Sequence, residues 1–251
     1  MSYWTLSLTL VFILITMLLS LRQRLGLEKE IAVGTVRAAI QLFAVGYVLD
    51  YIFRTRHPLF IFLILAVMIT VAAENARKRG KGLPGAFWRI VVAITATETV
   101  TMGLLLLLGL VKPEPQYIIP ISGMIIGNAM VVCALYLNQM KREVEASRGE
   151  VEVLLSLGAT VRQAVQDPLK RAVKASMIPS IDGMKTVGLV QLPGMMTGMI
   201  IAGASPLQAV RYQILIMFSF SASAALTSIL LALISYRMWF AADDRLLGRN
   251  G

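Results

Sequence analysis

The stretch Tyr117-Ile-Ile-Pro-Ile-Ser-Gly-Met-Ile-Ile-Gly-Asn-Ala-Met-Val-Val-Cys-Ala-Leu-Tyr-Leu137 contains no charged residue over 21 positions. At a helical rise of about 1.5 Å per residue, it is long enough to cross a hydrocarbon core about 30 Å thick. Similar apolar runs recur along the chain, which is 57% hydrophobic and only 15% charged. Soluble domains hold about 25% charged residues. The sequence therefore predicts an all-α, polytopic membrane protein.

We expect about seven transmembrane helices, at 3–20, 31–53, 58–73, 90–111, 117–137, 183–203 and 207–236. The third run is short and is expected to continue towards Glu74, and the last is long enough to tilt or to project from the membrane. The spans leave no room for a separate soluble domain of ordinary size. The prediction is therefore a single transmembrane domain over residues 1–251.

The distribution of basic residues predicts the orientation. Nineteen of the 24 Lys and Arg residues lie in the connections that follow the first, third, fifth and seventh spans, and three lie in the opposite connections. The positive-inside rule places the first set in the cytoplasm. We expect a multi-pass protein of the cell inner (plasma) membrane, with its N-terminus outside and its C-terminus in the cytoplasm. The net charge of +10 then reflects orientation in the lipid bilayer and does not indicate nucleic acid binding.

The one long connection, residues 138–182, lies on the predicted cytoplasmic side. Its first part, 138–149, is charged and is expected to extend the fifth helix outward. In 150–166 the apolar residues fall close to the i, i+3, i+4 repeat of a helix with one apolar face, at Val151, Leu154, Leu155, Val161 and Val165. The pair Asp167-Pro168 stops this helix and starts a second one, which is expected to end before Pro179. Such a helix would lie on anionic lipid or bind a partner protein.

A spacing within this segment favours a partner protein. Glu152 stands six residues before Gly158, which is followed by Ala159-Thr160 and Arg162. This pattern resembles the start of the EAA loop of ABC-transporter permeases, a coupling helix that sits in a groove of the ATPase subunit. The later Ile-x-Leu-Pro part of that motif is not at its usual spacing. The resemblance implies that a cytoplasmic ABC ATPase contacts Glu150, Glu152, Leu155, Gly158 and Arg162.

A second stretch carries a broader resemblance. Gln191-Leu-Pro-Gly-Met-Met-Thr-Gly198 and its continuation to Gln213 are similar to the signature of the FetB-type iron-export permeases, which plant aluminium-tolerance permeases also resemble. The pattern Arg37-Ala-Ala-Ile-Gln41 and the pair Glu98-Thr99 extend the likeness over nearly the whole chain. The resemblance implies a permease that exports iron with energy from ATP, which a separate ATPase subunit hydrolyses with Mg. A nucleotide sugar is the alternative cargo.

Polar side chains inside the spans are candidates for a translocation pathway. Counted from the predicted cytoplasmic ends, Arg37, Glu98, Asn128 and Gln191 lie roughly 9–13 Å deep, and Gln41 is one turn beyond Arg37 on the same face. A charged residue in a span costs roughly 2.5–3.5 kcal/mol. Arg37 and Glu98 would either form a structural ion pair or act in transport, with Glu98 meeting the cargo. An iron ion would find oxygen ligands on Glu98, Asn128 and the threonines at 95, 97, 99 and 101.

Proline and glycine residues mark expected bends and packing faces. Pro193 and Gly194 are expected to kink or open the sixth span. The pairs Gly123/Gly127 and Gly194/Gly198 have the small-residue spacing that lets helices approach closely, within one subunit or between two copies.

The chain lacks the residues that ATP hydrolysis needs. It contains no G-x-x-x-x-G-K-[ST] pattern, so we expect no catalytic residue and no cofactor here, with ATP and Mg bound by the partner ATPase. Seven spans are few for a complete path, so two copies of the chain are expected to pair. An ion-gradient-driven carrier that uses Glu98 and Arg37 is the alternative from another class, and a membrane-embedded enzyme is disfavoured because no His-acid, Cys-His or Ser-based constellation is visible.

Overall fold

The computed structural model describes residues 8–55, 57–79, 83, 85–241 and 243–247. Over these ranges the chain is helical, and β-structure is limited to two isolated bridges. It separates into two compact units, Met1–His57 and Pro58–Gly251, and each is described by itself. The all-helical membrane prediction is confirmed, whereas the single domain over 1–251 stays a prediction.

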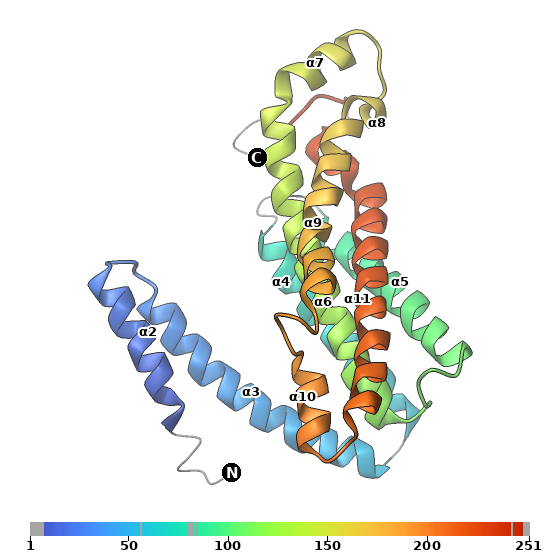
Figure 1. The fold of residues 1–251 in the computed structure, drawn as a ribbon. Helices are drawn as coiled ribbons and strands as arrows, with labels where there is room; N and C mark the ends of the chain where they lie inside the picture. The colour runs from blue at the N-terminus through green and yellow to red at the C-terminus, as the bar shows by residue number, and fades with distance from the viewer. Residues whose placement is uncertain (1–7, 56, 80–82, 84, 242, 248–251) are drawn as a thin grey trace. The chain divides into compact units, whose positions relative to one another are not determined.

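The first unit is a helical hairpin of α2 (Leu10–Arg22) and α3 (Glu28–Thr55). Ser20 closes it: its hydroxyl donates to Glu28 Oε1 at 2.8 Å and accepts from the Leu27 amide at 3.4 Å. Figure 1 shows α2 folded back beside α3. α3 is long and apolar enough to cross a membrane, while α2 is a shorter apolar helix. Residues 3–7 of the first predicted span lie outside the described residues.

The second unit is a helix bundle around α6 (Figure 1). α6 packs against α4, α5, α9 and α11. The bounds are Pro58–Arg79 for α4, Ala86–Leu107 for α5, Pro115–Ala146 for α6, Gln166–Thr186 for α9, Gly194–Ile201 for α10 and Pro206–Ser235 for α11, which a 3₁₀ turn, η1, continues over Tyr236–Trp239.

The long helices begin where the sequence supplies suitable residues. Pro115 and Pro206 each occupy the first turn of their helix, where the missing N–H breaks no hydrogen bond. Ser205 caps α11 by accepting from the Gln208 amide at 3.3 Å. α6 continues past the predicted membrane boundary at Leu137 to Ala146, as expected from the charged stretch that follows.

The predicted count of seven spans is not confirmed: within the described residues, five helices are long and apolar enough to cross a membrane, namely α3, α4, α5, α6 and α11. The sixth predicted span, 183–203, does not form one helix. α9 ends at Thr186, and α10 begins at Gly194 and has only 8 residues. Between them Gly188 adopts φ +82°, which glycine tolerates best, and Pro193 is extended at the N-cap of α10. These two residues break the helix.

The segment predicted to be cytoplasmic also departs from its predicted secondary structure. The expected helix over 150–166 is divided into α7 (Arg148–Ser156) and α8 (Val161–Ala164). Gly158, with φ +89°, follows the end of α7, as glycine commonly does at a helix C-terminus. α9 then continues through Pro179 to Thr186 and does not end before the proline. Its packing along α6 and α11 offsets the roughly 3 kcal/mol that an interior proline costs.

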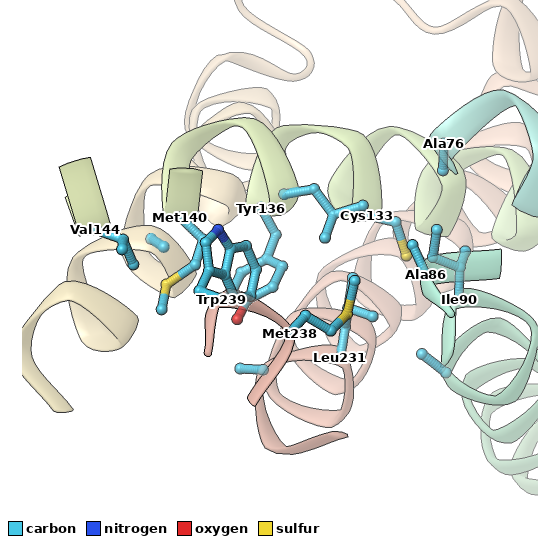
Figure 2. Close-up of a cluster of buried hydrophobic side chains, with 14 of the residues drawn as sticks. Ala76, Ala86, Ile90, Cys133, Tyr136, Met140, Val144, Leu231, Met238 and Trp239 are labelled. Atoms are coloured by element: carbon cyan, nitrogen blue, oxygen red, sulfur yellow. The ribbon is translucent and has the colours of Figure 1, made fainter. Parts of the chain in front are cut away.

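At one end of the second unit, which we call the α7 end, the ends of several helices pack into a shared hydrophobic core. The cluster includes Ala76 near the end of α4, Ala86 at the start of α5, Val144 near the end of α6, and Trp239 after α11. Figure 2 shows Trp239 in this cluster with side chains of α6. Arg89 Nε donates to the Ile234 carbonyl at 2.9 Å, which ties the start of α5 to the end of α11.

Candidate functional site

A cavity of about 260 Å³ lies between α6, α9, α11 and the break that follows α9. Its polar lining comes from side chains on all of these segments: Asn128, Ser176, Ser180, Gln191 and Gln213. Two of the predicted pathway residues, Asn128 and Gln191, are thus brought together at one site.

The polar residues of this cavity differ in how they are satisfied. The Asn128 amide donates to Ser223 Oγ at 2.9 Å and to the Phe220 carbonyl at 3.0 Å, both on α11. Ser176 and Ser228 share a hydrogen bond of 2.7 Å between their hydroxyls. In contrast, Gln213 Oε1 is buried without a hydrogen-bond partner among the described residues. A buried acceptor of this kind is costly to leave unpaired. Gln213 Oε1 is therefore available to accept a hydrogen bond from a molecule in the cavity.

Glu98 lies in a second polar site, on α5. The residue is 5% exposed, and both of its carboxylate oxygens lack a hydrogen-bond partner in the part of the chain that the structure describes. The Ser122 hydroxyl of α6 is close enough to interact with the carboxyl group, although outside standard hydrogen-bond geometry. Thr101 Oγ1 is buried and unpaired in the same way. One carboxylate and two hydroxyls are hard oxygen ligands, which suit hard cations.

The expected ligand set for iron is only partly assembled. Of the four threonines, Thr97 and Thr101 are buried, whereas Thr95 and Thr99 are exposed, and the Thr99 hydroxyl is bonded to the Thr95 carbonyl at 2.8 Å. Asn128 belongs to the cavity described above. Among the described residues, no three or more His, Cys, Asp or Glu side chains group so as to hold a metal ion. Within the predicted ligand set, Glu98 is the one acidic side chain.

Two predicted pathway residues, Arg37 and Gln41, lie in the first unit. Both are exposed on α3 and line a shallow, largely apolar pocket on that helix. Their placement relative to Glu98 stays a prediction.

The predicted coupling segment is anchored to the α7 end of the bundle. Val151 is fully buried, and Leu154 and Leu155 pack against the same core. The opposite face is exposed, with Glu150, Glu152, Val153 and Leu157, and Arg162 is exposed on α8. The segment thus offers a mixed apolar and charged face.

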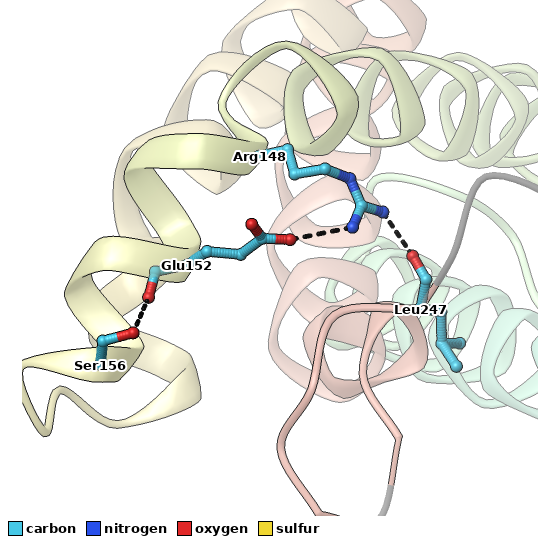
Figure 3. Close-up of polar contacts among 4 residues, drawn as sticks. All are labelled: Arg148, Glu152, Ser156 and Leu247. Atoms are coloured by element: carbon cyan, nitrogen blue, oxygen red, sulfur yellow. Dashed lines mark hydrogen bonds and ion pairs between the residues drawn. The ribbon is translucent and has the colours of Figure 1, made fainter.

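Ion pairs and hydrogen bonds anchor the start of α7. Arg148, its first residue, contacts Glu152 Oε1 at 3.0 Å and donates to the Leu247 carbonyl at 2.5 Å; both contacts are drawn in Figure 3. Near the start of α7, Arg171 of α9 donates to Glu143 at 2.5 Å and to Ser147 Oγ at 2.9 Å. The hydrogen bond to Glu143 raises the pKa of Arg171 above its ordinary value.

The chain after α11 forms a short hairpin that the sequence patterns did not indicate. Phe240 pairs with Leu246 in an antiparallel bridge, and the Leu247 amide donates to the Trp239 carbonyl at 2.8 Å. We call residues 239–241 and 243–247 the C-terminal hairpin. Asp243 pairs with Arg245, and this hydrogen bond lowers the pKa of Asp243 below its ordinary value. Asp244 pairs with Arg237 at 2.8 Å.

The predicted hinge and packing residues divide by their surroundings. A Cβ on Gly123 would lie 2.9 Å from Met68 Cε of α4, so this glycine allows a close helix contact. Cβ atoms on Gly127, Gly194 and Gly198 would meet nothing within 4 Å.

Comparison with known proteins identifies the family. The family model described as "Uncharacterised protein family (UPF0014)" matches residues 3–240. The UPF0014 membrane protein YjkA of Bacillus subtilis is 49% identical over 246 residues, which cover 98% of each chain. The probable iron export permease protein FetB of Escherichia coli is 39% identical over 243 residues, covering 97% of this chain and 94% of FetB. No solved structure matches.

A plant relative extends the same likeness. Protein ALUMINUM SENSITIVE 3 of Arabidopsis thaliana is 40% identical over 220 residues, which cover 88% of this chain and 81% of the plant protein. The resemblance inferred from the stretch around Pro193 is therefore confirmed along most of the sequence. This chain belongs to the UPF0014 family of membrane proteins, together with the FetB-type permeases and their plant relatives.

Proposed function

We propose that this chain is the membrane-spanning permease subunit of an ABC transporter, that two copies work with two separate ATPase subunits, and that the complex exports iron. The proposal places the α7 end in the cytoplasm of a cell whose inner membrane the helices cross. Iron as cargo rests on the likeness to FetB, a probable iron export permease. ATP and Mg would be bound by the partner.

The observation that carries the proposal is the exposed face of α7 at the end where basic residues gather. The last turn of α4 holds Arg77, Lys78 and Arg79, and this helix end shares a core cluster with Val151 of α7. Positive charge favours the cytoplasmic side of a membrane. A segment anchored by its buried face and exposed on the other suits contact with a cytoplasmic ATPase.

The same arrangement suggests how force would reach the pathway. α7 is joined to the end of α6, and Arg171 ties α9 to the same junction. α6 and α9 both line the cavity that holds Asn128 and Gln191. A displacement of α7 by the ATPase would therefore move two walls of the cavity. Glu98 on α5 would meet the cation through its carboxylate.

ATP hydrolysis by the purified complex in lipid tests this function. Ferrous iron should stimulate hydrolysis by the wild type, and Glu152→Ala should uncouple hydrolysis from iron transport because it removes a charge from the exposed face of α7. Asp167→Ala is the matched control, since Asp167 is also exposed and paired, with Lys170 on α9. Iron stimulation that is absent from the wild type would exclude iron as the cargo.

A second candidate is an ion-gradient-driven carrier. Glu98 favours it, because a buried and unpaired carboxyl group inside a span is suited to binding a coupling ion. Transport by this chain alone, driven by an imposed ion gradient without ATP or an ATPase, would support the carrier and would contradict the ABC proposal.

A further inference from the structure

A groove of about 450 Å³ lies between α4 and α6 on the second unit, and we call it the α4–α6 groove. Its lining divides into a polar part, with Asn75, Arg79 and Asn138, and an apolar part on α6, with Met130, Val131 and Ala134. None of the polar residues belongs to the two polar sites described above. The groove is therefore a separate feature of the bundle.

The polar and apolar parts separate at the predicted membrane boundary on both helices. On α6 the apolar residues lie within the predicted span 117–137, and Asn138 directly follows it. On α4, Asn75 and Arg79 both follow the predicted span 58–73. Both helices run towards the α7 end. The groove thus has its polar part at headgroup level, and its apolar part extends about 12 Å into the hydrocarbon layer.

The polar part of the groove offers hydrogen-bond donors and one positive charge. Among the described residues that line it, Arg79 is the one charged side chain. Arg79 is exposed and forms no ion pair within the described part of the chain, and the amides of Asn75 and Asn138 form no hydrogen bond there. A guanidinium and two amides can donate to the oxygens of a phosphate group.

The surrounding helix ends, 74–79 of α4 and 138–146 of α6, carry a positive excess. Their carboxylates are largely neutralised, because Glu74 pairs with Arg77 and Glu143 pairs with Arg171 of α9. The charged residues left without an ion pair among the described residues are four cations and one carboxylate: Lys78, Arg79, Lys141, Arg142 and Glu145. An anionic headgroup would be attracted to this end of the groove, whereas a cation would be repelled.

We propose that the α4–α6 groove binds an anionic phospholipid of the leaflet at the α7 end. The lipid phosphate accepts from Arg79 and from the amides of the polar part, and one acyl chain lies along Val131 and Ala134. An apolar helix in the groove would leave these donors without acceptors. Basic pockets between transmembrane helices recognise anionic headgroups in this way.

The bound chain would contact a wall of the candidate pathway. Val131 and Leu135 line both the α4–α6 groove and the cavity that holds Asn128 and Gln191. An acyl chain in the groove therefore supports the α6 side of that cavity. The inference does not depend on the ABC function or on iron as cargo, since it uses only the membrane setting of the bundle.

Native mass spectrometry of the full-length chain in mild detergent tests the site, with phosphatidylglycerol and the zwitterionic phosphatidylethanolamine as probes. The wild type should retain phosphatidylglycerol in preference. Arg79→Gln should weaken its binding by about fivefold, which is the effect of one basic residue near an anionic membrane surface. Lys78→Gln is the matched control, because Lys78 is exposed on the same helix turn but does not line the groove, and it should bind as the wild type does.

A thermal assay and a competition assay test the fold and the apolar part. Phosphatidylglycerol should raise the melting temperature of the wild type and of Lys78→Gln, but not that of Arg79→Gln, since a ligand of the folded state stabilises it. Ala134→Trp should lose the same lipid-induced shift because the indole fills the apolar part. Melting temperatures without added lipid show whether each variant is folded. Soluble glycerol phosphate, which lacks acyl chains, should not displace phosphatidylglycerol.

Three results would overturn the proposal. Equal losses in Arg79→Gln and Lys78→Gln would mean that surface charge alone attracts the lipid. A wild type that does not prefer phosphatidylglycerol would mean that another part of the protein, or a second copy, covers the groove. Displacement by glycerol phosphate would indicate a site for free phosphate esters. None of these results bears on ATPase binding, so the proposed function is tested separately.

Discussion

Replacing Glu98 with glutamine distinguishes a structural ion pair from a transport site, because the two predict stability changes of opposite sign. Glu98 is 5% exposed, with no hydrogen-bond partner for its carboxylate among the described residues. An unsatisfied buried polar group costs about 1–3 kcal/mol, and a charged one inside a span costs about 2.5–3.5 kcal/mol on insertion scales. Glutamine keeps the shape and removes the charge. We expect Glu98→Gln to raise the free energy of unfolding by about 1–3 kcal/mol.

A structural pair with Arg37 predicts the reverse. Removing one partner of a buried ion pair costs about 3–5 kcal/mol, because the other charge is left uncompensated. Glu98→Gln and Arg37→Gln would then each destabilise the protein. The double variant would show a coupling energy well above about 1 kcal/mol. In the unpaired arrangement the coupling energy is close to zero.

Reversible unfolding in mixed micelles, followed by the fluorescence of the three tryptophans, measures these free energies. Iron transport by the reconstituted complex is measured on the same preparations. We expect Glu98→Gln to be more stable and inactive in transport. A destabilised variant with strong coupling to Arg37 would refute the reasoning, and so would a stabilised variant that transports iron normally.

Three further substitutions test local features. Gly158→Ala should destabilise the turn after α7 by about 1–2 kcal/mol, because a residue with a Cβ is strained at φ +89°. The added Cβ meets nothing within 4 Å, so the strain comes from the backbone alone, and it should uncouple ATP hydrolysis from transport. Gly127→Ala should raise the melting temperature through helix propensity, since its Cβ meets nothing within 4 Å, and Gly123→Ala should raise it less because Met68 Cε must shift; equal melting temperatures would contradict this assignment. Asn128→Leu should cost about 1–3 kcal/mol in unfolding free energy through two lost hydrogen bonds and should slow transport, and an unchanged transport rate would remove the cavity from the pathway.

The helices predicted best are those with continuous apolar runs. The predicted spans 58–73, 90–111, 117–137 and 207–236 each fall largely on one helix: α4, α5, α6 and α11. Hydropathy succeeds there because only a helix satisfies the backbone in lipid. It fails at 183–203, because a sum over apolar residues does not register a break. Gly188 and Pro193 carried that signal, and the expected bend at Pro193 took account of only part of it.

The residues of the candidate sites were likewise predicted only in part from the sequence. Asn128 and Gln191, two of the predicted pathway residues, both line one cavity, although the predicted depth of Gln191 assumed a continuous helix over 183–203 that the structure does not have. Gln213 was missed as a candidate, although an amide within an apolar run was the available signal. The C-terminal hairpin was missed because so short a segment has no periodicity to detect, and its structure depends on Trp239 reaching a core built by other helices.

Two unpaired polar side chains, Glu98 and Gln213, contrast with other buried polar groups that the bundle pairs between helices. Thr97 and Thr227 share a hydrogen bond of 3.0 Å across α5 and α11, and Ser176 and Ser228 share one across α9 and α11. These two pairs satisfy four buried hydroxyls and join neighbouring helices, whereas the hydroxyls of Thr101 and Ser122 have no hydrogen-bond partner among the described residues. Immediately beside Thr97, Glu98 is left without a partner, as is Gln213 in the cavity. Because each such group is costly in a dry interior, we expect a ligand or water to complete their hydrogen bonds.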